Sequence, residues 1–77
     1  MELNILIFGQ LIDITGSARI NLPAVKDTND LKQEMNRRFP LFINAKYVMA
    51  VDNHIVNENT SLNPGCTIAL LPPFSGG

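Results

Sequence analysis

The chain has 77 residues, of which 45% are hydrophobic and 17% charged, and its formal net charge is −1. These values are typical of one small globular domain and argue against disorder. Arg37-Arg38 is the only adjacent basic pair, so a phosphate-tracking surface for nucleic acid is disfavoured. No apolar run approaches the length of a membrane span, and Glu2 stands where a signal peptide carries positive charge. The single cysteine, Cys66, has no internal disulfide partner, which favours a reducing cytoplasm.

Two strands are predicted in the first third of the chain. The first covers residues 3–8, and its alternation puts three apolar side chains on one face, Leu3, Ile5 and Ile7. Leu6 and Phe8 then project from the opposite face. Gly9 ends this strand, and residues 10–16 form a connection that can include a short helical turn. A second strand is predicted over residues 18–22, where Pro23 stops it.

One helix is predicted to begin near Thr28, whose hydroxyl is expected to cap the first turn. Its apolar stripe recurs at every fourth residue, at Leu31, Met35 and Phe39. Arg37 and Arg38 suit the negative end of the helix dipole, and Pro40 prevents the helix from continuing.

The second half of the chain is predicted to hold three more strands. Residues 46–52 and 54–56 are expected to pair around a turn at Asp52-Asn53, and Asn63-Pro64-Gly65 to turn the chain into a last strand at 67–71. The order is β-β-α-β-β with a short extra strand. The first and last strands are the most apolar, so they are expected to lie side by side at the centre of a mixed sheet covered by one helix. This α+β arrangement is the β-grasp, or ubiquitin-like, fold, with a domain at residues 1–71 and a flexible, extended tail at 72–77.

No internal group of side chains has the composition of an enzyme active site. His54 and Cys66 each stand alone, without a second ligand or nucleophile at a useful spacing, and Cys66 is better explained as a small buried hydrophobe. Asp27 and Asp30 fit the positive end of the helix dipole better than a catalytic carboxylate pair. The sequence has no glycine-rich phosphate loop and predicts no metal site and no bound cofactor.

The last six residues have a different character. Pro72 and Pro73 cannot continue a sheet and stiffen the chain as it leaves the domain. Gly76 and Gly77 have no side chains, so they can enter a narrow channel in another protein. Phe74 offers an apolar anchor, and Ser75 separates it from the glycines. We therefore expect the Gly77 carboxylate to be the working group, delivered to a partner that activates it, because an ionised carboxylate is a poor electrophile.

Residues 71–77, with two prolines and two glycines, resemble the end of the small subunit of molybdopterin synthase, a sulfur carrier of molybdenum-cofactor biosynthesis. Residues 6–11 are similar to the first strand and following turn of that family, and 63–65 match its turn before the last strand. The resemblance covers the whole chain.

The resemblance implies that an E1-like enzyme adenylates Gly77 with ATP bound in trans. A sulfur donor then displaces AMP to leave a thiocarboxylate, and the charged carrier donates its sulfur to a cyclic pterin precursor in the large subunit. It also implies a complex of two small and two large subunits. The chain itself is then not an enzyme but the sulfur-donating subunit of one.

Two alternatives share these glycines, namely a sulfur carrier of another pathway, such as the thiamine type, and a ubiquitin-like protein modifier. A plain β-grasp interaction module is a third. For the partner surface, alternation in the two central strands predicts an apolar patch of Leu6, Phe8, Ala69 and Leu71 beside the start of the tail. The opposing interpretation is that the 10–16 connection covers Phe8 and makes it core.

Overall fold

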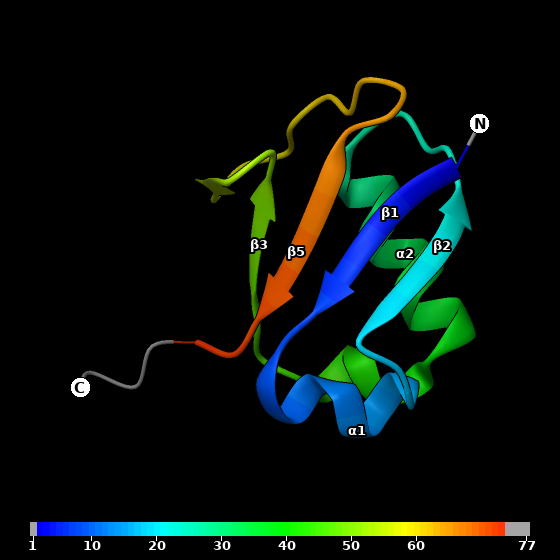
Figure 1. The fold of residues 1–77 in the computed structure, drawn as a ribbon, viewed down its shortest axis with the longest axis vertical. Coiled ribbons are helices and arrows are strands. Elements are labelled where there is room, and N and C mark those ends of the chain that lie inside the picture. The colour runs from blue at the N-terminus through cyan, green and yellow to red at the C-terminus, as the bar shows by residue number, and fades with distance from the viewer. Residues whose placement is uncertain (1, 74–77) are drawn as a thin grey trace.

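Five strands and one long helix make up residues 2–73, the part of the chain that the computed structural model describes (Figure 1). The elements are β1 (Glu2–Ile7), the 3-10 turn η1 (Gly9–Leu11), α1 (Ile12–Thr15), β2 (Arg19–Pro23), α2 (Thr28–Arg38), the 3-10 turn η2 (Pro40–Asn44), β3 (Val48–Val51), β4 (His54–Val56) and β5 (Thr67–Leu71). The predicted order is therefore confirmed, with α2 as the main helix and α1 as a single turn in the 10–16 connection.

The strand order in the sheet is β2-β1-β5-β3-β4. β1 and β5 are parallel, with Ile5 opposite Ile68 and Ile7 opposite Leu70, while the other three pairings are antiparallel. The prediction that the first and last strands lie together at the centre is confirmed. The sheet is mixed, and with α2 across it the fold is the β-grasp.

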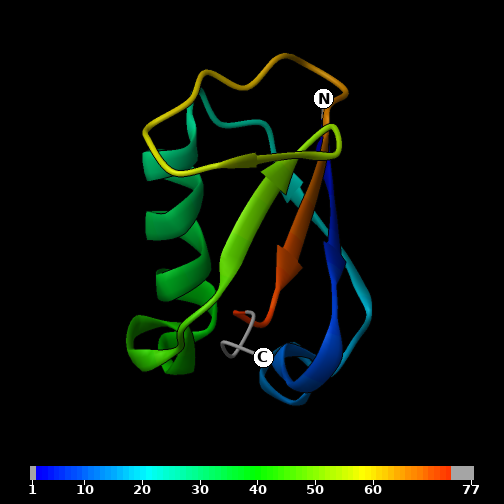
Figure 2. The same cartoon turned by 90° about the vertical axis from the view of Figure 1, so that its left-hand side faces the viewer.

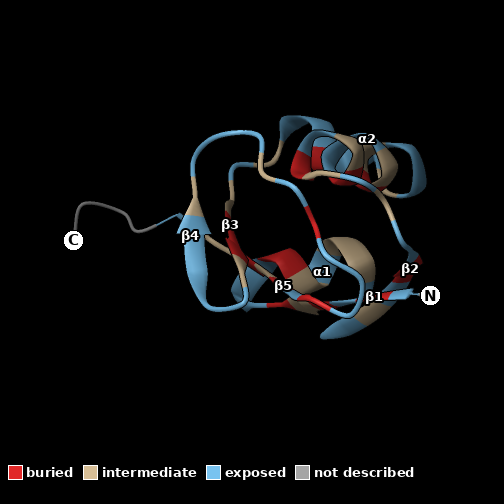
Figure 3. Ribbon diagram, turned by 90° about the horizontal axis from the view of Figure 1, so that it is seen from above, coloured by how far each residue is buried: buried red, intermediate tan, exposed pale blue. Residues whose placement is uncertain are grey.

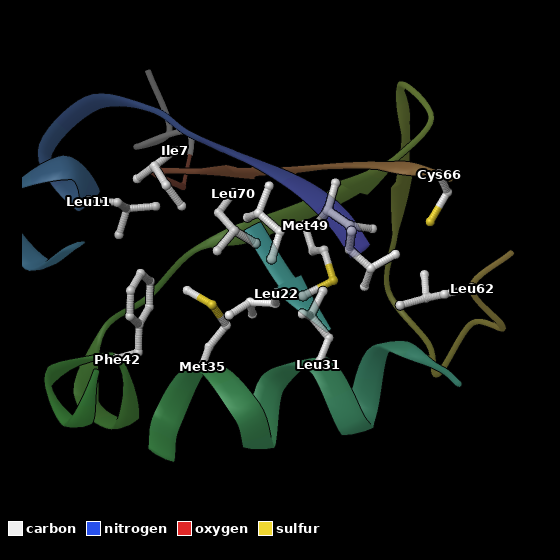
Figure 4. Close-up of a cluster of buried hydrophobic side chains, with 13 residues drawn as sticks. Ile7, Leu11, Leu22, Leu31, Met35, Phe42, Met49, Leu62, Cys66 and Leu70 are labelled. Atoms are coloured by element: carbon white, nitrogen blue, oxygen red, sulfur yellow. The ribbon is translucent and has the colours of Figure 1, made fainter. Parts of the chain in front are cut away.

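The helix α2 covers one face of the sheet, and the buried residues lie between these two layers (Figures 2 and 3). Leu3, Ile5 and Ile7 of β1 point into this space and are at most 2% exposed, as predicted from their alternation. Leu31 and Met35 meet them from α2 and are fully buried. Close packing of these side chains is shown in Figure 4, and their removal from water is the main favourable term in folding.

The last residue of the predicted apolar stripe, Phe39, is less buried than the stripe predicts. Phe39 is half-buried, and the aromatic that fills this end of the core is Phe42, which is 2% exposed. Phe42 comes from η2, which the sequence did not predict, because Pro40 ends α2 but also starts a tighter turn. The Phe42 ring meets those of Phe39 and Tyr47 edge-on, at centroid distances of 6.1 and 5.4 Å.

Three predicted strands differ from the observed ones by one or two residues at both ends. β1 ends at Ile7, because Gly9 turns the chain at a φ of +61° just after Phe8. β2 includes Pro23, which is tolerated because β2 is an edge strand. β3 begins only at Val48. The predicted turn at Asp52-Asn53 is confirmed, and both residues have positive φ values, as a two-residue hairpin turn requires.

The prediction that Thr28 caps α2 is wrong, because the cap is Asp27. Asp27 has an extended backbone, and its carboxylate accepts a hydrogen bond from the Asp30 N–H at 2.9 Å. Thr28 is already helical, so its hydroxyl turns to the loop after β4, accepting from the Thr60 N–H at 3.0 Å and bonding Asn59 Oδ1 at 3.3 Å. Thr28 thus fastens that loop to the helix and is 2% exposed.

The Asp27 cap is expected to contribute to the pH dependence of stability. The hydrogen bond from Asp30 lowers the pKa of Asp27, so its contribution is present above the ordinary carboxyl range and is lost as the pH falls from about 4 through the folded-state pKa. Asp27→Ala should lower the thermal midpoint at pH 7. Asp27→Asn, an equally good cap, should keep most of that midpoint but unfold with a shallower pH dependence in acid.

Thermal melts of the three proteins between pH 2 and 7 test this. Glu34 also has a lowered pKa, because Arg37 and Arg38 donate hydrogen bonds to it. Glu34 is present in all three proteins, so only the difference between the native chain and Asp27→Asn reports on Asp27. An unchanged acid profile in Asp27→Asn would refute the assignment.

Cys66 belongs to the core rather than to a reactive site. Its side chain is 5% exposed and packs in the cluster between the sheet and α2 (Figure 4). Burial, and to a smaller degree the charge of Asp52, raises the pKa of the Cys66 thiol. The thiolate, which is the reactive form, is therefore suppressed at neutral pH.

Cys66→Ser should cost about 1–3 kcal/mol of unfolding free energy, because it buries a hydroxyl in an apolar site. Urea unfolding measures this cost. His54→Ala is the matched control at an exposed position and should change stability little. The native thiol should react with a thiol reagent much more slowly than the urea-unfolded one. Equal rates would show that Cys66 is accessible.

Candidate functional site

The tail leaves the domain from the end of a central strand. β5 ends at Leu71, and Pro72 and Pro73 follow it at the end of the sheet where β1 also finishes (Figure 1). Pro72 is half-buried and Pro73 is exposed. The start of the tail is therefore held by the domain at Pro72 and exposed to solvent one residue later.

Gly9 makes the close packing of Pro72 possible. A Cβ added to Gly9 would lie 2.6 Å from Pro72 Cγ, closer than carbon atoms approach, and the φ of +61° at Gly9 already disfavours a side chain. The backbone after β1 thus forms the seat for the first proline of the tail. Sequence reasoning gave Gly9 only the role of ending a strand, because the contact joins segments more than 60 positions apart in the chain.

An apolar patch lies on the face of the sheet opposite α2, next to this exit. We define the outer-face patch as Leu6, Phe8, Val48, Ala50, Ala69 and Leu71. The strand register brings them together, with Leu6 opposite Ala69, Ala69 opposite Ala50, and Leu71 opposite Val48. Phe8 joins them because its N–H donates a hydrogen bond to the Leu70 carbonyl at 3.0 Å.

Phe8 is the most exposed member of the patch, with 43% of its surface accessible. The interpretation of Phe8 as a core residue covered by the 10–16 connection is therefore wrong. The connection instead turns aside and leaves a hollow of about 600 Å³ beside the ring, with Leu6, Phe8 and Ile12 as its apolar walls and Arg19 at its margin. The patch thus has both a protruding aromatic and an adjoining recess, as interfaces often do.

The remaining candidates stay apart from this site. His54 is exposed on β4, with Nδ1 3.1 Å from the Asp52 carbonyl oxygen. Within residues 2–73, no three His, Cys, Asp or Glu side chains gather in a way that would hold a metal ion. None of the helices in that part of the chain is long and apolar enough to cross a membrane. Phe74, Ser75, Gly76 and Gly77 lie outside the described residues, so their predicted roles stay predictions.

Comparison with solved structures supports the fold. The chain aligns with molybdopterin converting factor subunit 1 from Pyrococcus furiosus at 20% identity, covering 96% of this chain and 99% of that one, with a TM-score of 0.84. SAMP1 from Haloferax volcanii aligns over the full length of both chains at 17% identity and a TM-score of 0.81. A chain from the complex of subunits 1 and 2 of molybdopterin-converting factor from Helicobacter pylori also aligns in full, at 26% identity and a TM-score of 0.72.

The family assignment rests on the sequence itself. The ThiS family model matches residues 5–77, which includes nearly all of the described domain and the whole tail with its two glycines. The expected resemblance to small ubiquitin-like sulfur carriers is thereby confirmed at the level of the family, which includes carriers of more than one pathway. The chain belongs to the ThiS family of small ubiquitin-like sulfur carriers.

Proposed function

We propose that this chain carries sulfur for molybdenum-cofactor biosynthesis as the small subunit of molybdopterin synthase, in the cytoplasm, with the Gly77 carboxylate as the reacting group. The observation that carries the proposal is the family match through residue 77, joined to a tail that starts beside the partly exposed outer-face patch, of which Phe8 is the most exposed member. The Helicobacter pylori relative, solved as a complex of subunits 1 and 2, supports a large-subunit partner.

The proposed reaction begins with activation, because an ionised carboxylate is a poor electrophile. The Gly77 carboxylate, ionised at neutral pH, attacks the α-phosphate of ATP on an E1-like enzyme, which releases pyrophosphate and forms an acyl-adenylate. A donor that supplies sulfur at the sulfide level attacks the acyl carbon, and AMP leaves, which gives a thiocarboxylate. In the large subunit the thiocarboxylate sulfur bonds to a carbon of the cyclic pterin precursor as the leaving group on that carbon departs. Water then cleaves the bond between this sulfur and the Gly77 acyl carbon, which leaves the sulfur on the pterin and restores the Gly77 carboxylate. ATP binds only to the activating enzyme, and the carrier brings no cofactor of its own.

The domain supplies a rigid handle for this tail. Pro72 packs on Gly9 and Pro73 continues outward, so the direction in which the tail starts is fixed by the fold. Residues 72–77 span about 20 Å when extended, which is enough to reach a buried site in a partner. Gly76 lets the backbone pass a narrow channel, and Phe74 and Ser75 give the partner side chains to hold before that channel.

The outer-face patch is the proposed docking surface. A partner that covers Leu6, Phe8 and Leu71 at the same time would hold the start of the tail against its own entry channel, because Leu71 is the last residue of β5. Phe8 is the proposed anchor, since exposed aromatics contribute strongly when buried in an interface. Two small and two large subunits are expected to form the complex, with the adenylating enzyme using the same patch at an earlier step.

The two alternative functions of a tail that ends in two glycines differ from the proposed one in what finally receives sulfur or the chain itself. A carrier of the thiamine type would pass its sulfur to a thiazole-forming enzyme, and a modifier would end joined to lysine side chains. The double proline before Phe74 favours the molybdopterin pathway among these. Incubation of the thiocarboxylate form with each of the two candidate acceptors shows which pathway receives the sulfur. A search for conjugates to lysine side chains tests whether the chain is a protein modifier.

Removal or extension of the terminus should abolish the reaction without affecting the fold. Intact mass spectrometry after incubation with the adenylating enzyme, ATP and a sulfur source should show one oxygen exchanged for sulfur in the native chain. Neither a chain lacking Gly77 nor one extended by a single residue should show this change, although both should melt like the native protein. Cys66→Ser and His54→Ala are the positive controls and should be converted normally. Conversion of the chain lacking Gly77 would disprove the proposal.

Truncation of Phe8 should weaken binding more than folding. Because 43% of the ring is exposed, Phe8→Ala should cost less stability than the ~3–5 kcal/mol typical of a core aromatic, yet reduce affinity for the large subunit about tenfold or more. Leu41→Ala is the matched control, since Leu41 is 70% exposed on η2, on the helix side (Figure 2). Calorimetric titration and thermal melts give both quantities. Normal binding of the large subunit by the folded Phe8→Ala protein would show that Phe8 is not the anchor of the interface.

A further inference from the structure

Gly9 stands between two parts of the proposed interface. Phe8, the residue before it, is the exposed aromatic of the outer-face patch, and its N–H donates a hydrogen bond to the Leu70 carbonyl of β5 at 3.0 Å. Pro72, the first residue of the tail, packs directly on Gly9. The turn after β1 and the start of the tail therefore lie side by side (Figure 1), and one residue connects the docking surface to the tail.

The packing at Gly9 leaves no room for a side chain. An added Cβ would lie 2.6 Å from Pro72 Cγ and 3.3 Å from Pro72 Cδ, so the Pro72 ring would have to move by most of an ångström. The other glycines of the described residues, Gly16 and Gly65, have similarly positive φ values of +76° and +82°. A Cβ at either of them would meet nothing within 4 Å. Among these three glycines, close contact with the tail is therefore specific to Gly9.

Two consecutive prolines make the chain stiff directly after this contact. The ring of Pro72 fixes its own φ, and Pro73 restricts the ψ of Pro72 to extended values. Pro72 is half-buried on the domain, whereas Pro73 is exposed. The orientation of the Pro72 ring on Gly9 therefore sets the direction in which Pro73 leads the chain away from the sheet.

A small displacement of Pro72 is magnified at the terminus. Residues 73–77 span about 17 Å when extended, so a tilt of about 15° at Pro72 would displace the Gly77 carboxylate by about 4 Å. Misplacement of a reacting group by about 1 Å can lower a rate about a hundredfold. The contact with Gly9 thus lies at the point where a small structural change has a large effect on the reaction.

We propose that Gly9 and Pro72 form a positioning pair that aims the tail once Phe8 has docked. The inference rests on the proposed function, because it assumes a partner whose active site receives Gly77. A partner that covers Phe8 also fixes the next residue, Gly9, and through it the direction of Pro72. Phe8 then governs how tightly the carrier binds, whereas the positioning pair governs how often the bound carboxylate reaches the reacting position.

Kinetics of the adenylation step separate these two roles. The adenylating enzyme from the same genome is mixed with ATP, labelled pyrophosphate and varied carrier, and carrier-dependent exchange of the label into ATP gives kcat and KM for the carrier. Gly9→Ala should lower kcat about tenfold or more and change KM little, because the docking surface is intact. Gly65→Ala is the matched control, since it adds a side chain at positive φ without a contact to Pro72, and it should keep the native kcat.

Pro72→Ala tests the same contact from the other side. Alanine lacks Cγ and Cδ but keeps Cβ, which lies at an ordinary 3.9 Å from a Cβ added to Gly9. Pro72→Ala alone should lower kcat, because it removes the ring that packs on Gly9. Addition of Gly9→Ala to Pro72→Ala should lower kcat no further, and should lower the thermal midpoint only as much as Gly65→Ala lowers it in the native chain. This double variant also tests the pair if the clash in Gly9→Ala prevents folding.

Three results would overturn the inference while leaving the proposed function intact. They are an equal kcat for folded Gly9→Ala and Gly65→Ala, a change in Gly9→Ala that is confined to KM, and a further loss of kcat when Gly9→Ala is added to Pro72→Ala. Absence of carrier-dependent exchange with the native chain would instead refute the proposed function, and this inference with it.

Discussion

β1 and β5 pair in parallel at the centre of the sheet, and the rest of the molecule depends on that pairing. It aligns Ile5 with Ile68 and Ile7 with Leu70 on the face that α2 covers, so the two strands contribute the middle of the core. Because the strands are parallel, both finish at the same end. The tail therefore leaves beside the turn after β1, where Gly9 receives Pro72.

The two faces of the central strands have different tasks. The inner face is buried under α2 and fixes the fold, whereas the outer face carries Leu6, Phe8 and Leu71 without a covering layer. Because no helix covers this outer face, its apolar side chains bury less surface than they would under a second layer of secondary structure. The loss is small because Ala50 and Ala69 are small side chains, and the patch is available to a partner.

Hydrogen bonds and side-chain packing at the two ends of the core hold α2 and the neighbouring loops in place. Asp27 fixes the beginning of α2, and Thr28 ties the long loop after β4 to it through Thr60 and Asn59. Phe42, which belongs to η2, fills the other end of the core. Packing of Phe42 in the core and of Pro72 on Gly9 thus supports the end from which the tail leaves.

Sequence patterns were enough to predict the strand order, the main helix, the central position of the first and last strands and the division of their side chains between two faces. Alternation with a period of two and a helical stripe are local patterns, so they can be read directly from neighbouring residues. The two terminal glycines likewise pointed to the family. The tertiary structure was needed to show that Asp27 rather than Thr28 caps α2, that Phe42 fills the core and that Gly9 seats Pro72. The Asp27 cap is itself a local hydrogen bond to Asp30, but Thr28 is drawn away from the cap by Asn59 and Thr60, more than 30 positions further along the chain. Phe42 and Pro72 likewise reach their places through contacts with distant segments, which no local pattern records.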